Sequence, residues 1–234
     1  MTTLERTRDG WNEIAAGFDE FVTPANMRLG TEAVERLGLR PDIRFLDVAA
    51  GSGALSIPTA RLGAHVLATD RSPTMLERLE ARAHAEDLTH VQSRLMDACA
   101  LELEDDQFDV SASQHGVHDL PSALREITRV TKPGGRVALI AHGPPHQVET
   151  LSFFMGAMYA VAPGCARTID ESPSSAYRVA DRHQLLGTLA GAGLREISVE
   201  TIVQEMRFGS GKQSNPVRRS PQARLGANQT ARTD

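Results

Sequence analysis

A glycine-rich turn and an acidic residue further along the chain are spaced as a nucleoside-binding site requires. The turn occupies residues 47–53 (Asp-Val-Ala-Ala-Gly-Ser-Gly), and Asp70 lies 23 positions after Asp47. Glycine lets the backbone approach a ligand closely, and an acid about 20 positions further on is placed to accept hydrogen bonds from ribose hydroxyls. The alternatives are a purely structural turn and an acid that caps the next helix. The two features together favour a nucleoside.

Further polar residues follow two later apolar segments. The carboxylate of Asp97 and the backbone N–H of Ala98 suit the amino group and a ring nitrogen of adenine. Gln114, His115 and His118 follow the next segment. Imidazole titrates near neutral pH, so either histidine is a candidate general base. A solvated loop acid and ordinary surface histidines are the alternatives.

The elements that position these residues alternate between strand and helix. Apolar runs predict buried strands at 43–50, 65–69, 90–93, 108–113 and 137–141, and helices are predicted between them. With right-handed crossovers, this order gives a doubly wound α/β fold, a parallel sheet with helices on both faces. Such sheets bind ligands at the carboxyl ends of their strands, which is where the polar residues fall.

The regions on either side of this core are predicted to complete a single domain over residues 1–208. Residues 1–39 form a helical N-terminal cap, and 143–180 are an insertion that covers the substrate. A helix at 181–192 and a strand at 194–203 follow. Residues 209–234 are polar and basic, so we predict a disordered tail and a missing last strand.

Composition narrows the class of protein. The chain has 234 residues, 41% of them apolar, and a net charge of −5, which gives no bulk attraction to nucleic acid or to an anionic membrane. No apolar run reaches the length of a membrane span, and the start lacks a signal-peptide core. Cys99 and Cys165 form no CxxC pair. We therefore expect a cytoplasmic protein without a disulfide, metal, nucleic-acid partner or membrane partner; a homodimer is left open.

The motifs resemble those of class I S-adenosylmethionine-dependent methyltransferases. Residues 47–53 are similar to their first motif in a DxAxGxG variant, and 69–76 (Thr-Asp-Arg-Ser-Pro, then Leu76) to their acidic loop. Residues 124–135, which end in Lys-Pro-Gly-Gly, resemble the segment before strand five. The resemblance covers about 43–141 and is greatest to the ubiquinone/menaquinone-biosynthesis (UbiE-like) type. It implies a mostly parallel, seven-stranded, Rossmann-like sheet.

The resemblance also implies a cofactor site for S-adenosylmethionine, with S-adenosylhomocysteine as product. The two glycines of the turn would lie against the methionine part, Asp47 near its ammonium, Asp70 at the ribose, Asp97 and Ala98 at the adenine and Gln114 at the far wall. The implied cofactor-binding residues are Asp47, Ala49, Gly51, Gly53, Asp70, Arg71, Met75, Asp97, Ala98 and Gln114. Ala49 departs from the family by replacing the first glycine of the usual GxGxG.

The function implied is methyl transfer to a small-molecule acceptor, on oxygen or carbon, with His115 or His118 as the base. Two alternatives remain. A non-catalytic protein that binds S-adenosylmethionine or S-adenosylhomocysteine would explain the unusual carboxyl end. An NAD-dependent oxidoreductase is disfavoured, because the third glycine of GxGxxG is missing after Gly53.

Overall fold

The structure, a computed structural model, describes residues 3–117, 119–143, 148–149, 182–203 and 227–232. The strands are β1 (Arg44–Val48), β2 (His65–Asp70), β3 (Val91–Leu95), β4 (Phe108–Gln114), β5 (Thr131–Ala141), β6 (Arg195–Thr201) and β7 (Ala227–Arg232). The helices are α1 (Thr3–Gly17), η1 (Phe18–Val22), α2 (Thr23–Leu37), α3 (Ser56–Arg61), α4 (Pro73–Ala85), α5 (Leu120–Val130) and α8 (Arg182–Gly191). Their order confirms the predicted alternation of strands and helices.

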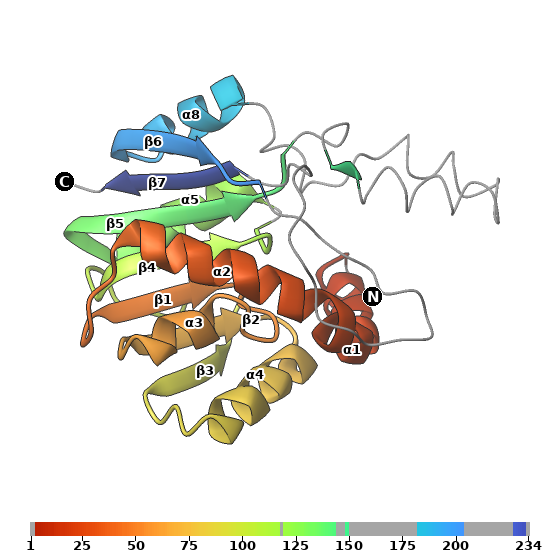
Figure 1. The fold of residues 1–234 in the computed structure, drawn as a ribbon. Coiled ribbons are helices and arrows are strands. Elements are labelled where there is room, and N and C mark those ends of the chain that lie inside the picture. Colours follow the sequence, from red (N-terminus) through yellow and green to blue (C-terminus); the bar gives the residue numbers. More distant parts are fainter. Residues whose placement is uncertain (1–2, 118, 144–147, 150–181, 204–226, 233–234) are drawn as a thin grey trace.

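The strands form one seven-stranded sheet in the order β3-β2-β1-β4-β5-β7-β6 (Figure 1). The pairs among β1 to β5 are parallel, whereas β7 runs antiparallel to both β5 and β6. The chain moves outward from β1 to β3 and then returns to place β4 beside β1. The strand order therefore reverses between β1 and β4, and a ligand site is expected at their carboxyl ends.

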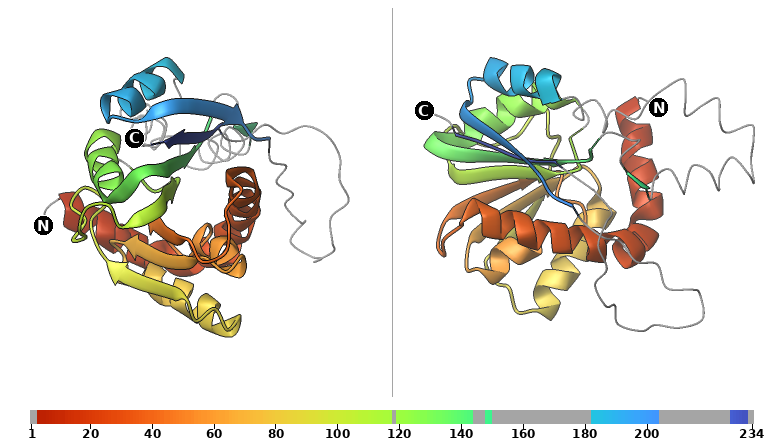
Figure 2. Two further views of the ribbon diagram at one scale, coloured as in Figure 1. Left: turned by 90° about the vertical axis from the view of Figure 1, so that its left-hand side faces the viewer. Right: turned by 45° about the horizontal axis from the view of Figure 1, so that its top comes forward.

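Helices cover both faces of the sheet (Figure 2). Alternate residues of β5 point to opposite faces, so Val137 and Leu139 pack with α5 and α8, whereas Ala138 and Ile140 pack with α2 and α3. Helix α4 lies on the same side as α3, where Leu79 packs against Ala68 of β2. The predicted doubly wound α/β architecture is confirmed.

Local sequence signals fix the start of several helices. Ser72 Oγ accepts a hydrogen bond from the Met75 N–H at 3.1 Å, which caps α4, and Pro73 takes the first helical position. Pro58 is the third residue of α3, where its missing N–H breaks no helical hydrogen bond. The Lys-Pro-Gly-Gly run at 132–135, which precedes the predicted fifth strand at 137–141, lies inside β5, beside a register shift against β4.

The carboxyl end corrects the prediction of a missing last strand. Residues 227–232, within the predicted disordered tail, form β7 between β5 and β6. Their composition is Ala-Asn-Gln-Thr-Ala-Arg, which carries no large apolar side chain to indicate a strand. Backbone hydrogen bonds on both sides hold β7, and these do not depend on side-chain type. Residues 209–226 and most of 143–180 lie outside the described residues.

The N-terminal segment crosses the carboxyl edge of the sheet. Figure 2 shows α1 across the end where the parallel strands terminate. The N-terminal cap predicted over residues 1–39 is helical, and within it a π-helical turn, η1, follows α1 and leads into α2. Short π-turns occur frequently at functional sites. The segment lies where a cap over a ligand site would be.

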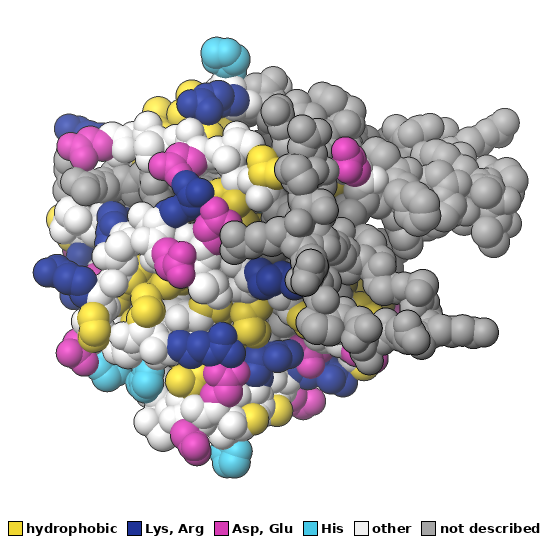
Figure 3. Space-filling view, in the orientation of Figure 1, with side chains coloured by type: hydrophobic (Ala, Val, Ile, Leu, Met, Phe, Trp, Pro, Cys, Tyr) yellow, Lys and Arg dark blue, Asp and Glu magenta, His cyan; other side chains and the backbone are white. Residues whose placement is uncertain are grey.

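The visible surface has no field of a single charge. Figure 3 shows acidic and basic side chains interspersed over the face formed by α2, α3 and α4. In the part of the chain that the structure describes, no helix is both long and apolar enough to cross a membrane.

Candidate active site

The glycine-rich turn after β1 has an unusual backbone. Ala49, Gly51 and Gly53 all have positive φ angles, of 57°, 55° and 93°. Left-handed backbone costs an alanine roughly 1–2 kcal/mol relative to right-handed backbone, which explains why the family motif has glycine where this chain has Ala49. At Gly53 an added Cβ would lie 3.0 Å from Leu79 Cγ, so a side chain there would crowd α4. The turn is tight, and α4 packs against it at Gly53.

Asp70 ends β2 with its carboxylate held in a fixed orientation. Oδ2 accepts the Gly51 N–H and Oδ1 accepts the Ser72 N–H, both at 2.8 Å. Burial raises the pKa of Asp70, and the hydrogen bonds from Ser72 and Gly51 oppose that shift. Each carboxylate oxygen has lone pairs for a further hydrogen bond, so the group is oriented by the protein and still able to bind a hydroxyl.

Asp47 lies beneath the turn rather than on its surface. Its side chain is 1% exposed, and Oδ2 accepts the Ser56 hydroxyl at 2.6 Å. Oδ1 is buried and has no hydrogen-bond partner among the described residues. Burial raises its pKa to about 7, and the hydrogen bond from Ser56 only partly offsets this. Asp47 therefore supports the turn from within the core.

The loop after β3 places Asp97 beside the end of β2. Asp97 Oδ1 accepts the Cys99 N–H at 3.0 Å and lies 3.3 Å from Arg71 Nη2. Ala98 is half-buried next to it, whereas the Met75 side chain is almost fully buried in α4. The predicted cofactor residues of the turn, Asp70 and Asp97 thus lie at the ends of three adjacent strands, β1, β2 and β3. We call this group of residues the acidic edge.

Gln114, at the end of β4, faces the N-terminal helices. Its Nε2 donates to the Asn26 carbonyl of α2 at 2.8 Å, and Oε1 is buried without a partner among the described residues. Gly30 packs against this side chain and against the turn, because an added Cβ there would lie 3.1 Å from Gln114 Oε1 and 2.3 Å from the Ala54 carbonyl oxygen. Gln114 therefore joins α2 to the sheet next to the turn.

Two further contacts anchor the N-terminal segment to the acidic edge, and sequence reasoning missed both. The Thr23 and Ser52 hydroxyls are 2.6 Å apart and buried, and Ser72 Oγ donates to Asn12 Oδ1 at 2.6 Å. Serine, threonine and asparagine are too common for such a pair to be recognised in a sequence. The contacts bring the start of α2 and the helix α1 onto the loops that follow β1 and β2.

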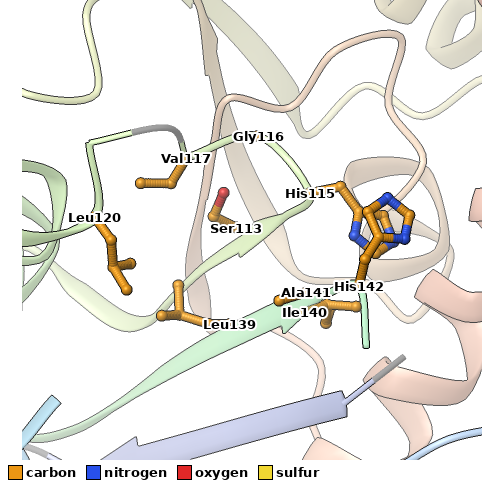
Figure 4. Close-up of a pocket in the computed structure, with 9 residues that line it drawn as sticks. All are labelled: Ser113, His115, Gly116, Val117, Leu120, Leu139, Ile140, Ala141 and His142. Atoms are coloured by element: carbon orange, nitrogen blue, oxygen red, sulfur yellow. The ribbon is translucent and has the colours of Figure 1, made fainter. Parts of the chain in front are cut away.

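A hollow opens at the ends of β4 and β5 (Figure 4). It contains about 340 Å³ of empty space, counting solvent at its mouth. The residues that line it, here called the histidine hollow, are Ser113, His115, Gly116, Val117, Leu120, Leu139, Ile140, Ala141 and His142. Ser113 Oγ and His115 Nδ1 are buried and lack partners among the described residues. The hollow therefore combines apolar walls with two polar atoms that could bind a ligand.

His115 is one of two imidazoles in the histidine hollow. Its ring stacks on that of His142, with centroids 3.8 Å apart and planes 7° from parallel. Burial lowers the pKa of His115 well below its ordinary value, and the charge of His142 lowers it further. Sequence reasoning missed His142, although it follows the predicted fifth strand directly. His118, the other predicted base, lies outside the described residues.

Comparisons with known proteins agree with this geometry. Residues 46–139 match the family described as a methyltransferase domain. The chain is 32% identical over 178 residues to a demethylmenaquinone methyltransferase of Streptomyces avermitilis, a match that covers 70% of this chain and 75% of that protein. An uncharacterized protein of Mycobacterium tuberculosis is 43% identical over 116 residues, 48% of this chain and 42% of that protein. The chain thus spans less than half the length of that mycobacterial relative.

Solved structures share the fold. A methyltransferase structure from Aquifex aeolicus, titled as dependent on S-adenosylmethionine, has a TM-score of 0.64 at 17% identity and covers 94% of this chain and 98% of its own. A structure from Methanococcus maripaludis, titled as a putative S-adenosyl-L-methionine-dependent methyltransferase, has a TM-score of 0.62 at 20% identity and covers 97% and 94%. At these identities the likeness concerns the fold.

Proposed function

Because this chain belongs to the class I S-adenosylmethionine-dependent methyltransferases, and resembles their ubiquinone/menaquinone-biosynthesis type, we propose that it transfers a methyl group to an uncharged small molecule held in the histidine hollow. Transfer goes to a hydroxyl oxygen or to a carbon activated by one. The observation that carries the acceptor assignment is the pair of unpartnered buried atoms, Ser113 Oγ and His115 Nδ1, within apolar walls.

The acidic edge fits the cofactor of this family. Asp70 presents an oriented carboxylate at the end of β2. At Gly51 in the turn beside it, an added Cβ would have no atom of the described residues within 4 Å. Ribose hydroxyls need an acceptor of this kind, and Asp97 offers one for an amino group. Asp47 contributes by holding the turn through Ser56.

When bound, S-adenosylmethionine supplies a methyl group that its sulfonium already activates. The protein's own residues then orient the acceptor and exclude water, which is the main source of acceleration for such a transfer. In the tautomer with hydrogen on Nε2, the His115 Nδ1 takes the proton that the acceptor loses. Its lowered pKa keeps this ring neutral at neutral pH and ready to accept that proton.

The hollow favours an uncharged acceptor. Its lining, as far as the structure describes it, holds apolar side chains, one hydroxyl and two imidazoles whose pKa values burial lowers. A carboxylate or ammonium buried there would lose its hydration without gaining an ionic partner, which is strongly unfavourable. A hydroxyl group could donate to His115 Nδ1, and a further uncharged polar group could pair with Ser113 Oγ.

The test is a transfer assay with methyl-labelled S-adenosylmethionine and phenols that differ in one para substituent: methyl, carboxylate or aminomethyl. We expect label on the uncharged phenol and little or none on the two charged ones. Transfer only to the charged phenols would contradict the acceptor assignment. Binding of S-adenosylhomocysteine without transfer to any acceptor would favour a non-catalytic binding protein.

A further inference from the structure

The two imidazoles of the histidine hollow are brought together by the register of the sheet. Gln114 pairs with Ile140, and the His115 N–H donates to the Ile140 carbonyl at 2.8 Å. Continued by one residue, this register places Ala141 opposite His115, so His142 lies one residue further along the neighbouring parallel strand, and the two rings lie face to face (Figure 4). Aromatic rings usually prefer an offset or edge-to-face arrangement, so a parallel stack at 3.8 Å indicates that the backbone imposes it.

The backbone of His115 is strained and cannot easily relax. His115 has a φ of 59°, a left-handed conformation that is uncommon for a residue with a side chain. Gly116 packs directly on the glycine-rich turn, because a Cβ there would lie 2.4 Å from Ala49 Cβ. Strain that the surroundings maintain in this way tends to occur at active sites, where it sets the direction of a side chain.

We propose that His142 is the positioning residue for His115: its ring is the wall that fixes the plane of the His115 imidazole and shields it from water. The proposal rests on the proposed function, in which His115 is the base. His142 itself receives no proton in this scheme. It acts by keeping His115 in one orientation, and a base displaced by about 1 Å loses on the order of 10²-fold in rate.

The two rings also share one electrostatic environment. Burial lowers the pKa of both, and a charge on His142 lowers that of His115 further. Among the described residues, the side chains that line the hollow from β4, the loop after it, α5 and β5 carry no other titratable group. Ala49 of the glycine-rich turn, which contacts Gly116, is also uncharged. The pair therefore accepts one proton far more readily than two.

Two substitutions separate positioning from other roles. His142→Phe keeps a flat ring on His115 and keeps water out, whereas His142→Ala removes the wall. We expect kcat to be lower in His142→Ala than in His142→Phe by roughly ten-fold or more, because only the phenylalanine still holds the plane of the His115 ring. Solvent reaching His115 in His142→Ala would raise its pKa towards the ordinary value, so the acid limb of the kcat/KM profile moves to higher pH.

An NMR titration of the His115 ring in the cofactor-free protein gives a readout independent of turnover. The expected result is a higher pKa for His115 in His142→Ala than in His142→Phe or wild type, with binding of S-adenosylhomocysteine unchanged in both variants. Equal His115 titration in the two variants would overturn the proposal. Loss of activity in His142→Phe as complete as in His142→Ala would also overturn it, by making His142 a catalytic group. If wild type transfers no methyl group, the proposed function fails, and the titration still decides whether His142 controls His115.

Discussion

At the ends of β1, β2 and β3, hydrogen bonds from protein groups hold the acidic side chains. At the ends of β4 and β5, by contrast, two buried polar atoms lie among apolar side chains and have no hydrogen-bond partner in the described part of the chain. Asp70 accepts hydrogen bonds from two backbone N–H groups, and Asp97 accepts them from the Arg71 side chain and from one backbone N–H. Ser113 Oγ and His115 Nδ1 receive none. The acidic edge is thus held in place by protein contacts, and the acceptor that we propose would supply the missing partners in the histidine hollow.

This difference suggests a division of labour. A polar cofactor common to a whole family requires fixed hydrogen-bond acceptors, and a backbone-held carboxylate provides them. An acceptor molecule that differs between relatives requires a shaped apolar space with few polar contacts. The substitutions below test the two regions separately and the contacts that join them to each other and to the N-terminal segment.

The largest effect is expected at the histidine hollow. His115→Gln removes the proposed base and should lower kcat by roughly 10²-fold or more, since general-base catalysis contributes about 10²–10⁴. Binding of S-adenosylhomocysteine, measured by calorimetry, should not change, because it depends on the acidic edge. His65→Gln, an exposed histidine at the start of β2, is the matched control. Undiminished turnover in His115→Gln would remove the base assignment.

The contact that joins the two regions should come next. Gly116→Ala places a Cβ 2.4 Å from Ala49 Cβ and 2.6 Å from its carbonyl oxygen, so we expect a loss of roughly 1–3 kcal/mol in the free energy of unfolding. Adding Ala49→Gly should restore part of it, because the carbonyl obstruction remains. Gly187→Ala, where an added Cβ has nothing within 4 Å, is the control for denaturant unfolding. Equal stability of Gly116→Ala and Gly187→Ala would refute the contact.

A pH effect on stability is expected from the acidic edge. Burial raises the pKa of Asp47 to about 7, above its unfolded value, so the folded state holds a proton that the unfolded state releases. The free energy of unfolding should therefore fall as pH rises from about 4 to about 7 and level off above that. Asp47→Asn stays neutral and should flatten this decline, whereas the exposed Glu102→Gln should not. A decline of the same slope in Asp47→Asn would be evidence against the shift.

The smallest effect is expected where the N-terminal segment is fastened to α4. Asp19 of η1 lies 2.5 Å from Arg82 Nη2 and 3.7 Å from Arg78 Nη1, and all three groups are partly exposed. Arg82→Ala should lower stability by about 1 kcal/mol or less, and by less still in high salt. Denaturant unfolding at two NaCl concentrations checks this. A salt-independent loss would point to packing by the arginine stem instead of the ion pair.

The acidic edge could be predicted because its signal is local. Short stretches of sequence are enough to recognise the glycine spacing of the turn, the acid at the end of the next strand, and the alternation of strands and helices. The edge where Asp70 and Asp97 meet then follows from the rule that parallel strands end together. Asp47 is the exception, because whether a carboxylate faces a ligand or the core depends on the helix packed above it.

The histidine hollow depended on pairing between distant segments. The stack of His115 on His142 requires the β4–β5 register, and the sequence holds no mark of that register. The same limit explains β7, whose polar residues 227–232 are held by strands on either side. The contact of Thr23 with Ser52 likewise arises only when α2 is placed over the turn.

The most direct test of the account is calorimetric binding of S-adenosylhomocysteine to wild type, Asp70→Ala and the control Glu102→Ala, with thermal melting to confirm that each is folded. A hydrogen bond to a charged group is worth about 1.5–3 kcal/mol, so Asp70→Ala should weaken binding by roughly 10- to 100-fold, whereas Glu102→Ala should bind like wild type. A folded Asp70→Ala protein that binds as tightly as wild type would contradict the placement of the cofactor at the acidic edge.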